Sequence, residues 1–424
     1  MFKSICLNAT TLLLCTQISA VTPPFLTTTS NQQLVAEQLQ NTDNEKEGRQ
    51  SHLLDLLAPL DEDQTLRALS QLAGTQYTTL FISTEIVNRQ FIRRLYDPLR
   101  VLISNQCSYD DEVYDICSSK GIDAWVEGSV NRSFLDGNKN AKGFKMSGYE
   151  VSGGAHKRLT STWTLGAGIC YAINHFHYNV GGSSKSNAVL GGVYTLYRPA
   201  NYYLLGNITF GYFKNDMHRR VQLNSTFVPA KEPQGLTGPE LSAFKLAQLA
   251  AEAENDKKDY LVKSRPNISE VTFYGEAGFD WNCNCVLVQP FVGFEANRFM
   301  RGCKVDKGEP SLRLIYSKKD VTNAYSRLGV HLTTPENCYD LTFALDLAWQ
   351  YRLTASQNDL TVRFKDFGTP FKITGVPNER NSIDMAFTVW SEIFEGWTLY
   401  LEASGERWKR VSNYQFTGGF LFKW

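Results

Sequence analysis

Beyond its first twenty residues the chain has no long apolar run, since no uncharged stretch reaches the roughly 18 residues that a membrane-crossing helix requires. It also has no excess of either charge, with 43 acidic and 43 basic residues. A chain without a basic stripe lacks the electrostatic footprint of nucleic-acid binding. The Gly-Xaa-Ser-Xaa-Gly elbow and the His-Glu-Xaa-Xaa-His helix are missing too, and both are signals of hydrolases. We therefore expect no nucleic-acid partner, no enzymatic activity, and no cofactor or metal.

The N-terminus carries the one apolar run. A single charge, Lys3, precedes an apolar stretch that ends at Leu12 to Leu14, and a short polar stretch then leads to Ala20. This order of charge, apolar run and small residue is that of a secretory signal peptide. The sequence therefore predicts a signal peptide over residues 1–20 and export of the remaining chain.

The last eleven residues of the chain alternate between aromatic and polar side chains. Successive side chains of a strand point to opposite faces, so one face of this segment is apolar and the other suits water. Such a segment with an aromatic C-terminus is typical of the last strand of a bacterial outer-membrane β-barrel. The alternative is the edge strand of a soluble sandwich with one buried face. The apolar face carries Tyr414, Phe416, Gly418, Phe420, Phe422 and Trp424.

Similar alternation recurs along the chain from residue 121 and is clearest over Leu341–Arg352. About six large apolar groups in a row on one face are enough for a tilted strand to cross the hydrocarbon layer. We expect an all-β fold, an antiparallel transmembrane β-barrel of about twelve strands. The predicted strands lie near 122–134, 144–157, 161–174, 187–198, 201–214, 268–282, 286–298, 323–333, 339–353, 380–393, 397–408 and 412–424.

The links between these strands alternate in length, as expected when short turns lie in the periplasm and long loops lie outside. The longest link, 215–267, contains a predicted short helix over Pro239–Glu254, which we expect to pack over the pore mouth. The predicted long links are 135–143, 175–186, 215–267, 299–322 and 354–379.

A different pattern precedes the first strand. From Asp63 to Pro98 apolar residues return at helical spacing, which predicts one long helix or two helices joined near Gly74. Asp61 and Asp63 are the candidate N-caps, and Pro98 is the expected stop. Arginines gather at the C-terminal end of this helix and need acidic partners, which favours a helix inside the barrel; an ordinary amphipathic helix in the periplasm is the alternative. The acids expected in the lumen are Glu127, Glu276, Asp280, Glu295, Asp346, Asp384 and Glu402.

The order of these segments resembles the autotransporter β-domain of Gram-negative bacteria. The resemblance covers residues 64–424 and rests on the runs LRALSQLAGTQY, AWVEGS, GYEVSGGAHKRLTSTWTLGAGICY, GEAGFDW, QPFVGFE, RNSIDMAF and GGFLFKW. It implies a twelve-stranded barrel of type V secretion, in the outer membrane, whose pore holds the helix that follows a translocated passenger. It also implies that Phe420, Phe422 and Trp424 form the signal read by the barrel-assembly machinery.

The expected organisation follows from this resemblance. A signal peptide over 1–20 precedes a short passenger remnant over 21–63, which is polar and expected to be disordered. A helical linker over 64–104 lies in or near the pore, and the barrel spans 105–424. In the linker, Arg89, Arg93 and Arg94 are expected to meet lumen acids, and we selected Glu276, Asp280 and Glu295 as their contacts.

Two functions remain open at this point. In the first, the barrel is a translocator that threads its own N-terminal segment to the cell surface, so that this segment and the long loops lie outside. In the second, it is a structural or adhesive outer-membrane barrel with the helix as a plug, crosslinked to its neighbours by disulfides. Outer-membrane lipid and the assembly machinery are the expected partners of either barrel.

Cysteine is unusually frequent for a protein that crosses an oxidising compartment. Of nine cysteines, Cys6 and Cys15 leave with the signal peptide, and the remaining seven include at least one without a partner in the chain. Cys107 and Cys117 are the candidate disulfide. The other thiols could crosslink envelope proteins, as would suit the disulfide-linked envelope of the chlamydiae; free or locally paired cysteines are the alternative.

Overall fold

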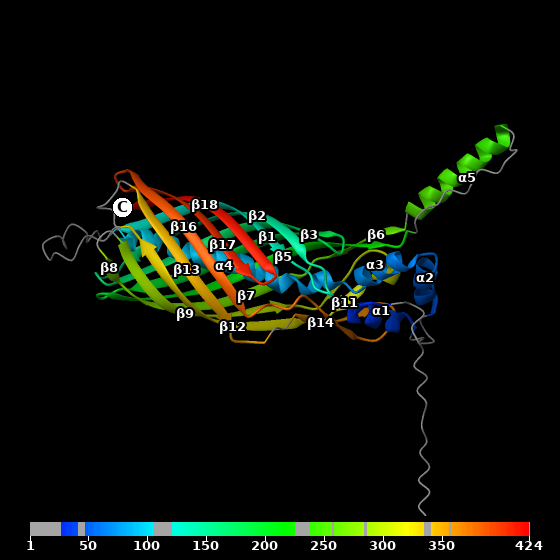
Figure 1. Cartoon of the computed structure of the whole chain (residues 1–424), viewed down its shortest axis with the longest axis horizontal. Helices are drawn as coiled ribbons and strands as arrows, with labels where there is room; N and C mark the ends of the chain where they lie inside the picture. Colours follow the sequence, from blue (N-terminus) through cyan, green and yellow to red (C-terminus); the bar gives the residue numbers. More distant parts are fainter. Residues whose placement is uncertain are drawn as a thin grey trace, which may run out of the picture.

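The computed structural model describes residues 27–40, 47–104, 121–224, 238–256, 258–283, 286–334, 341–355 and 358–423. Its main body is a closed antiparallel barrel of twelve strands with a helix through its middle (Figure 1). The predicted signal peptide over 1–20, the proposed Cys107–Cys117 disulfide and the terminal Trp424 lie outside the described residues.

All twelve predicted strands are present, because each segment has the period-2 pattern that a wall between lipid and lumen demands. Neighbours in sequence pair around the barrel, and the last strand closes on the first with Val126 opposite Phe420. The barrel strands are β1 (Ile122–Leu135), β2 (Phe144–Arg158), β3 (Trp163–Tyr178), β4 (Ser183–Tyr197), β5 (Tyr202–Gln222), β7 (Asn267–Phe279), β9 (Val286–Arg301), β12 (Lys319–Thr333), β13 (Thr342–Arg352), β16 (Asn381–Phe394), β17 (Trp397–Trp408) and β18 (Val411–Lys423).

One predicted long link is wrong. The link expected over 175–186 is only a tight turn, because β3 continues to Tyr178 and β4 begins at Ser183. The turn contains Gly181 and Gly182, whose φ angles of 109° and 95° are left-handed conformations that side chains with a Cβ rarely adopt. The two glycines therefore let the hairpin extend farther than its polar composition suggested.

The predicted helix is two helices joined at Gly74. Helix α3 (Glu62–Leu72) begins at Asp61, whose side chain accepts from the backbone N–H of Gln64 while the Gln64 side chain accepts from the backbone N–H of Asp61. Gly74 has a φ of 67° and leads through the 3₁₀ turn η1 (Thr75–Thr78) into α4 (Leu80–Ser104). The expected stop at Pro98 is wrong, since α4 continues past it with the loss of one helix hydrogen bond.

The segment before α3 corrects the expectation of disorder. In its described residues it forms α1 (Ser30–Gln40) and α2 (Glu47–Leu57), which bury Val35 and Leu39, and Leu53 and Leu57, respectively. Helix α1 contacts α3 and β15 (Phe371–Thr374), and α2 contacts the 3₁₀ turn η2 (Pro310–Leu312). A few apolar residues are enough to hold α1 and α2 in place, because the surface that covers these residues comes from distant barrel loops.

Those loops form a second, four-stranded sheet at the end of the barrel where the long links lie (Figure 1). Its order is β10 (Lys304–Val305), β11 (Leu314–Tyr316), β14 (Asp359–Phe364) and β15. We call α1, α2, α3, η1 and this sheet the cap. Two further short strands, β6 (Asp259–Ser264) and β8 (Trp281–Cys283), extend the barrel wall at opposite ends.

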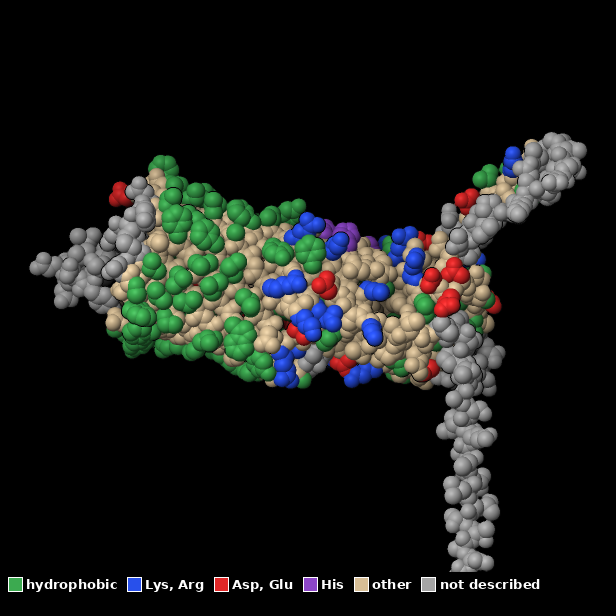
Figure 2. Space-filling view, in the orientation of Figure 1, with side chains coloured by type: hydrophobic (Ala, Val, Ile, Leu, Met, Phe, Trp, Pro, Cys, Tyr) green, Lys and Arg blue, Asp and Glu red, His purple; other side chains and the backbone are tan. Residues whose placement is uncertain are grey.

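The outer wall divides into two zones along the barrel axis. Figure 2 shows hydrophobic side chains covering the end with the short turns, whereas charged side chains cluster toward the cap. Helix α5 (Gly238–Asp256) confirms the helix expected in the longest link, but it projects away from the barrel instead of covering the mouth (Figure 1). None of the helices in the described ranges is long and apolar enough to cross a membrane.

Candidate functional site: the lumen helix and its cap

Helix α4 runs along the barrel lumen and is buried on almost all sides. Its apolar contacts depend on close approach to the wall: Leu95 lies over Gly168 of β3 and Gly192 of β4. A Cβ atom at Gly168 would lie 2.8 Å from Leu95 Cδ2, and one at Gly192 would lie 3.0 Å from Leu95 Cδ1. These glycines therefore form the hollow that seats Leu95.

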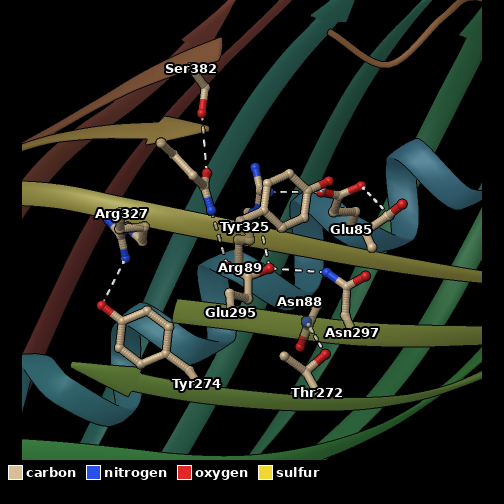
Figure 3. A network of polar contacts seen from close by, with 12 residues as sticks. Glu85, Asn88, Arg89, Thr272, Tyr274, Glu295, Asn297, Tyr325, Arg327 and Ser382 are labelled. Atoms are coloured by element: carbon tan, nitrogen blue, oxygen red, sulfur yellow. Dashed lines mark hydrogen bonds and ion pairs between the residues drawn. The ribbon is translucent and has the colours of Figure 1, made fainter. Parts of the chain in front are cut away.

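Arg89 is the centre of the first polar cluster on α4 (Figure 3). Its guanidinium lies 2.8 Å from a carboxylate oxygen of Glu85, 3.4 Å from Glu295 of β9 and 2.6 Å from Glu406 of β17. The same group stacks over the ring of Tyr325, 4.3 Å from its centroid. Three carboxylates and an aromatic ring thus hold one cation, so this part of α4 is bound to β9, β12 and β17 at once.

Glu85 and Asn88 also make hydrogen bonds to the wall around this cluster. Glu85 accepts hydrogen bonds from the side chains of Asn323 and Tyr325, and Asn88 donates to the hydroxyl of Thr272 at 2.9 Å. Figure 3 shows these side chains reaching from the helix to several neighbouring strands. The helix is therefore tied to the wall by hydrogen bonds as well as by charge.

Arg94 forms a second cluster on the other side of α4. It donates to Glu127 of β1 at 2.9 Å, to Glu150 of β2 at 2.7 Å and to Ser129 at 2.5 Å, and both carboxylates are fully buried. Tyr400 of β17 also donates to Glu127. A buried cation with two buried carboxylates is stable only while every member is present.

Arg93 faces a third part of the wall and pairs with Asp384 of β16. Arg327 of β12 donates to the same carboxylate at 2.7 Å, so Asp384 is held between a cation from the helix and one from the wall. A polar cavity of about 50 Å³ lies beside Arg89 and Arg93. That volume is enough for a few water molecules beside the helix.

The acids that we expected in the lumen do lie on that face, but two of the three selected contacts bind other groups. Glu295 meets Arg89. Glu276 accepts from Tyr203 at 2.7 Å and from Tyr274, and Asp280 pairs with Arg198 at 2.6 Å. Glu276 and Asp280 lie nearer the short-turn end of the barrel than the helix arginines do. The pairing register of a strand sets how deep in the lumen a residue lies as well as the face to which it points.

Several acids that pair with the helix arginines were not selected from the sequence. Most of them are glutamates in strands that the sequence had already predicted. Glu150 alternates onto the lumen face of β2 and Glu406 onto that of β17, so the same parity rule would have found both. The pairing of a given acid with a given arginine had no sequence signal, since it depends on how far α4 slides and turns inside the barrel.

The cap is fixed to the barrel mouth by side chains that bond to backbone groups. Asn31 of α1 donates to the carbonyl of Thr374 at 2.8 Å and accepts from its N–H at 2.9 Å, as a neighbouring strand would. Gln38 accepts from the N–H of Thr369 at 2.7 Å. Gln71 of α3 donates to the carbonyl of Val180 in the β3–β4 turn at 3.0 Å. The N-terminal helices are therefore docked specifically.

A buried charge pair lies under the cap. Arg219 of β5 pairs with Asp306 at 3.0 Å, and Tyr77 of η1 donates to the other oxygen of Asp306 at 2.7 Å. Burial raises the pKa of Tyr77, and the neighbouring Asp306 raises it further, so the phenol stays protonated and remains a donor. Tyr77 also stacks on Tyr316 of β11, in the four-stranded sheet of the cap, with ring centroids 4.6 Å apart.

The C-terminal residues implicated in assembly lie on the wall facing lipid. Phe420 is exposed and Phe422 half-buried, and they pair across the seam with Val126 and Ala124 of β1. The rings of Phe422 and Trp397 make an edge contact with centroids 4.3 Å apart.

Three cysteines fall in the described ranges, and each is a free thiol. Cys170 is buried, facing the lumen as its place in β3 requires. Cys283 and Cys303 are exposed, at the short-turn end and the cap end respectively. Within the part of the chain that the structure describes, no three His, Cys, Asp or Glu residues are grouped to hold a metal ion.

These features define a class: an outer-membrane β-barrel whose lumen is occupied by the chain's own helix. A family model of the autotransporter β-domain matches residues 124–232 and 250–404, and the chain belongs to this family. It is thus an outer-membrane translocator barrel of type V secretion.

Two solved structures of autotransporter barrels are similar to the chain, and the first of them supports the fold. The translocator domain of the autotransporter NalP from Neisseria meningitidis matches with a TM-score of 0.57 and 13% identity, over 81% of this chain and 98% of that one. The β-domain of the Bordetella autotransporter BrkA matches with a TM-score of 0.45 and 13% identity, over 72% of this chain and all of that one. None of the curated proteins compared with the sequence matches it.

Proposed function

We propose that this barrel threads its own short N-terminal segment to the cell surface and keeps it there as a folded cap. The observation that carries the proposal is positional. Helix α4 fills the lumen, and α1 to α3, which precede it in the chain, lie at the end with the long loops. Long loops of such barrels lie outside the cell, so the N-terminal segment has passed through the pore.

The contacts of the cap support retention of this segment. Asn31, Gln38 and Gln71 bond to backbone groups of barrel loops, and α1 and α2 bury their apolar residues there. A segment meant for release would leave those backbone groups without partners, which costs about 1–3 kcal/mol for each buried group. The cargo of this translocator is therefore part of its own surface structure.

An accessibility experiment on intact cells tests this proposal. One epitope is inserted beside Gly48, an exposed residue of α2 at which an added Cβ would meet nothing within 4 Å. The other is inserted at Thr160, in the exposed turn between β2 and β3 at the short-turn end. Antibody and protease should reach the first epitope and not the second, and the mature chain should stay cell-bound at full length.

Other outcomes contradict the proposal. If both epitopes are protected in a barrel that is heat-modifiable, the N-terminus stays in the periplasm and α4 is only a plug. If only the Thr160 epitope is reached, the orientation is inverted. If the Gly48 epitope appears in the medium, the segment is a released passenger.

Two partner proposals accompany this function. Phe420 and Phe422, with the terminal Trp424, would present the barrel to the assembly machinery. Replacing all three by Ala should leave the chain in the periplasm, whereas Phe416→Ala should not.

The exposed thiols of Cys283 and Cys303 would crosslink to envelope neighbours. Non-reducing gels of cells carrying Cys283→Ser or Cys303→Ser should lose the corresponding high-mass band.

A further inference from the structure

The outer face of the barrel carries a cluster of basic side chains beside the hydrophobic zone. Lys145 of β2, His175 and His177 of β3, and Lys185 of β4 all point outward and are exposed. Figure 2 shows Lys, Arg and His side chains gathered beyond the edge of the hydrophobic surface. We call these four residues the basic patch.

Strand pairing brings the four side chains together. Lys145 lies opposite His177 across β2 and β3, and His175 lies opposite Lys185 across β3 and β4. Residues directly opposite have Cβ atoms about 5 Å apart, and residues two apart on one strand are separated by roughly 7 Å. The four side chains therefore form one diagonal row across β2, β3 and β4, with the two histidines between the two lysines.

The two lysines of the basic patch are open to an anionic partner. Each ammonium group carries a positive charge and donates hydrogen bonds without accepting any. Among the described residues none of the four makes an ion pair. The one acid facing them, Asp216, lies opposite Lys185, but its carboxylate is 3.4 Å from Arg265 and 3.9 Å from His218.

The surroundings decide which anion fits. Ser147 and Ser183 face outward next to the two histidines and offer hydroxyl donors. Farther along the same strands toward the membrane, beyond Ser147 on β2 and Asn187 on β4, large apolar side chains are exposed, and they include Tyr149, Val151, Ile169, Tyr171 and Val189. A ligand that binds here therefore meets cationic donors at one end and a wide apolar surface at the other.

We propose that the basic patch binds a phosphate group of a phosphorylated glycolipid in the outer leaflet, with the acyl chains along the apolar positions below. Lysine ammonium groups and imidazole N–H groups donate to phosphate oxygens. At the opposite end of the same strands the outward residue of β2 is Lys157, which lies opposite the apolar Leu165 of β3 and not opposite a histidine. That asymmetry matches a membrane whose two leaflets differ in phosphate chemistry.

The test uses the full mature chain in phosphatidylcholine nanodiscs and measures binding of acylated glucosamine disaccharides by native mass spectrometry. The diphosphorylated form should bind at least roughly tenfold more tightly than the dephosphorylated form. The double variant Lys145→Gln and Lys185→Gln should lose roughly thirtyfold for the diphosphorylated form, because each surface cation near an anionic lipid contributes about a factor of five. The matched control is Lys157→Gln, which should leave binding unchanged.

Three outcomes overturn the proposal. Equal binding of the two disaccharides would show that phosphate is not recognised. An equal loss for Lys157→Gln would show a general effect of surface charge. Inorganic phosphate alone binding as tightly as the diphosphorylated disaccharide, with the barrel still heat-modifiable, would mean that the patch takes free phosphate and not the lipid.

Discussion

At the scale of residues, the lumen is held together by a small number of arginines that each serve several acids. Arg94 is the most enclosed of them, with Glu127 and Glu150 as partners and Ser129 as a further acceptor. Burial makes such a cluster all-or-none, because removing the cation leaves two carboxylates in a dry environment. Stability at this point therefore depends on completeness more than on any one contact.

The first prediction concerns this cluster. Arg94→Ala should lower the free energy of unfolding by about 3–5 kcal/mol, because Glu127 and Glu150 lose their cation while staying buried. Urea unfolding in detergent micelles, followed by heat-modifiable mobility, measures the change. Arg67→Ala on the exposed face of α3 is the control and should change stability by less than about 0.5 kcal/mol. Comparable losses in both variants would show that the lumen cluster is not special.

A compensated variant separates charge from packing. Arg94→Met combined with Glu127→Gln and Glu150→Gln removes the cation and both charges together. It should recover more than half of the stability lost in Arg94→Ala, since replacing a whole buried charge cluster is far milder than breaking it. No recovery would mean that the hydrogen-bond geometry of the cluster, and not its charge balance, carries the stability.

At the scale of elements, the docking of α1 against β15 connects the N-terminal segment to the barrel loops. The link passes through Thr374, which bonds Asn31 on one side and pairs with Asp359 of β14 on the other. Anything that loosens β14 from β15 should therefore also loosen α1. The cap is a cooperative unit even though its parts are more than 300 residues apart in sequence.

Loss of the Asn31 side chain should open this unit. Asn31→Ala leaves the backbone of Thr374 without its partner and should cost about 1–3 kcal/mol of local stability. Hydrogen exchange of the β15 amides should accelerate by a matching factor of roughly 5–150. Gln33→Ala is the matched control on the same helix, because its side chain is exposed and bonds only Glu37 in the described structure. If the exchange of the β15 amides is unchanged in Asn31→Ala, the contact of α1 with Thr374 does not stabilise β15 and α1 is not part of the cooperative unit.

The stability of the four-stranded sheet of the cap should also depend on pH. Burial raises the pKa of Asp359, but hydrogen bonds from Lys319 and Lys372 outweigh burial and lower the pKa from 3.8 to about 2. Because the folded pKa lies below the unfolded one, the carboxylate stabilises the sheet above pH 4, and that stabilisation is lost as pH falls from 4 to 2.

Hydrogen exchange between pH 4 and pH 2, corrected for intrinsic rates, measures this loss in β14 and β15. The wild type should lose protection over that interval, and Asp359→Asn should be less protected at pH 4 with a flatter dependence below it. Thr361→Ala, at an exposed position of the same strand, should follow the wild type. A wild-type sheet whose protection does not change would refute the role of Asp359.

At the scale of the whole molecule, the barrel is closed twice. Helix α4 fills the lumen and leaves a cavity of about 50 Å³, and the cap covers the mouth at the long-loop end. The two closures are different in kind. The lumen closure is marked by charge clusters between helix and wall, whereas the cap is joined to the loops mainly by side chains that bond to backbone groups.

Conductance in planar bilayers distinguishes the two closures. The full chain should conduct little. Deleting residues 27–60 removes α1 and α2 but keeps α4, and should leave conductance low. Deleting residues 27–104 should open a stable aqueous pore, because the lumen face of the wall is polar once the helix is gone. High conductance in the shorter deletion would show that the cap, and not α4, is the seal.

The sequence alone determined the barrel, because an alternating wall between lipid and water constrains every second side chain. The twelve strands, the start of α3 at Asp61, and the side on which Glu127, Glu295 and Asp384 lie therefore followed from the sequence. Only the tertiary structure decided which acid meets which arginine, because depth in the lumen depends on the position of α4. The fold of α1 and α2 could not be predicted for a related reason: the groups that bond to Asn31 belong to loops that only barrel closure brings near.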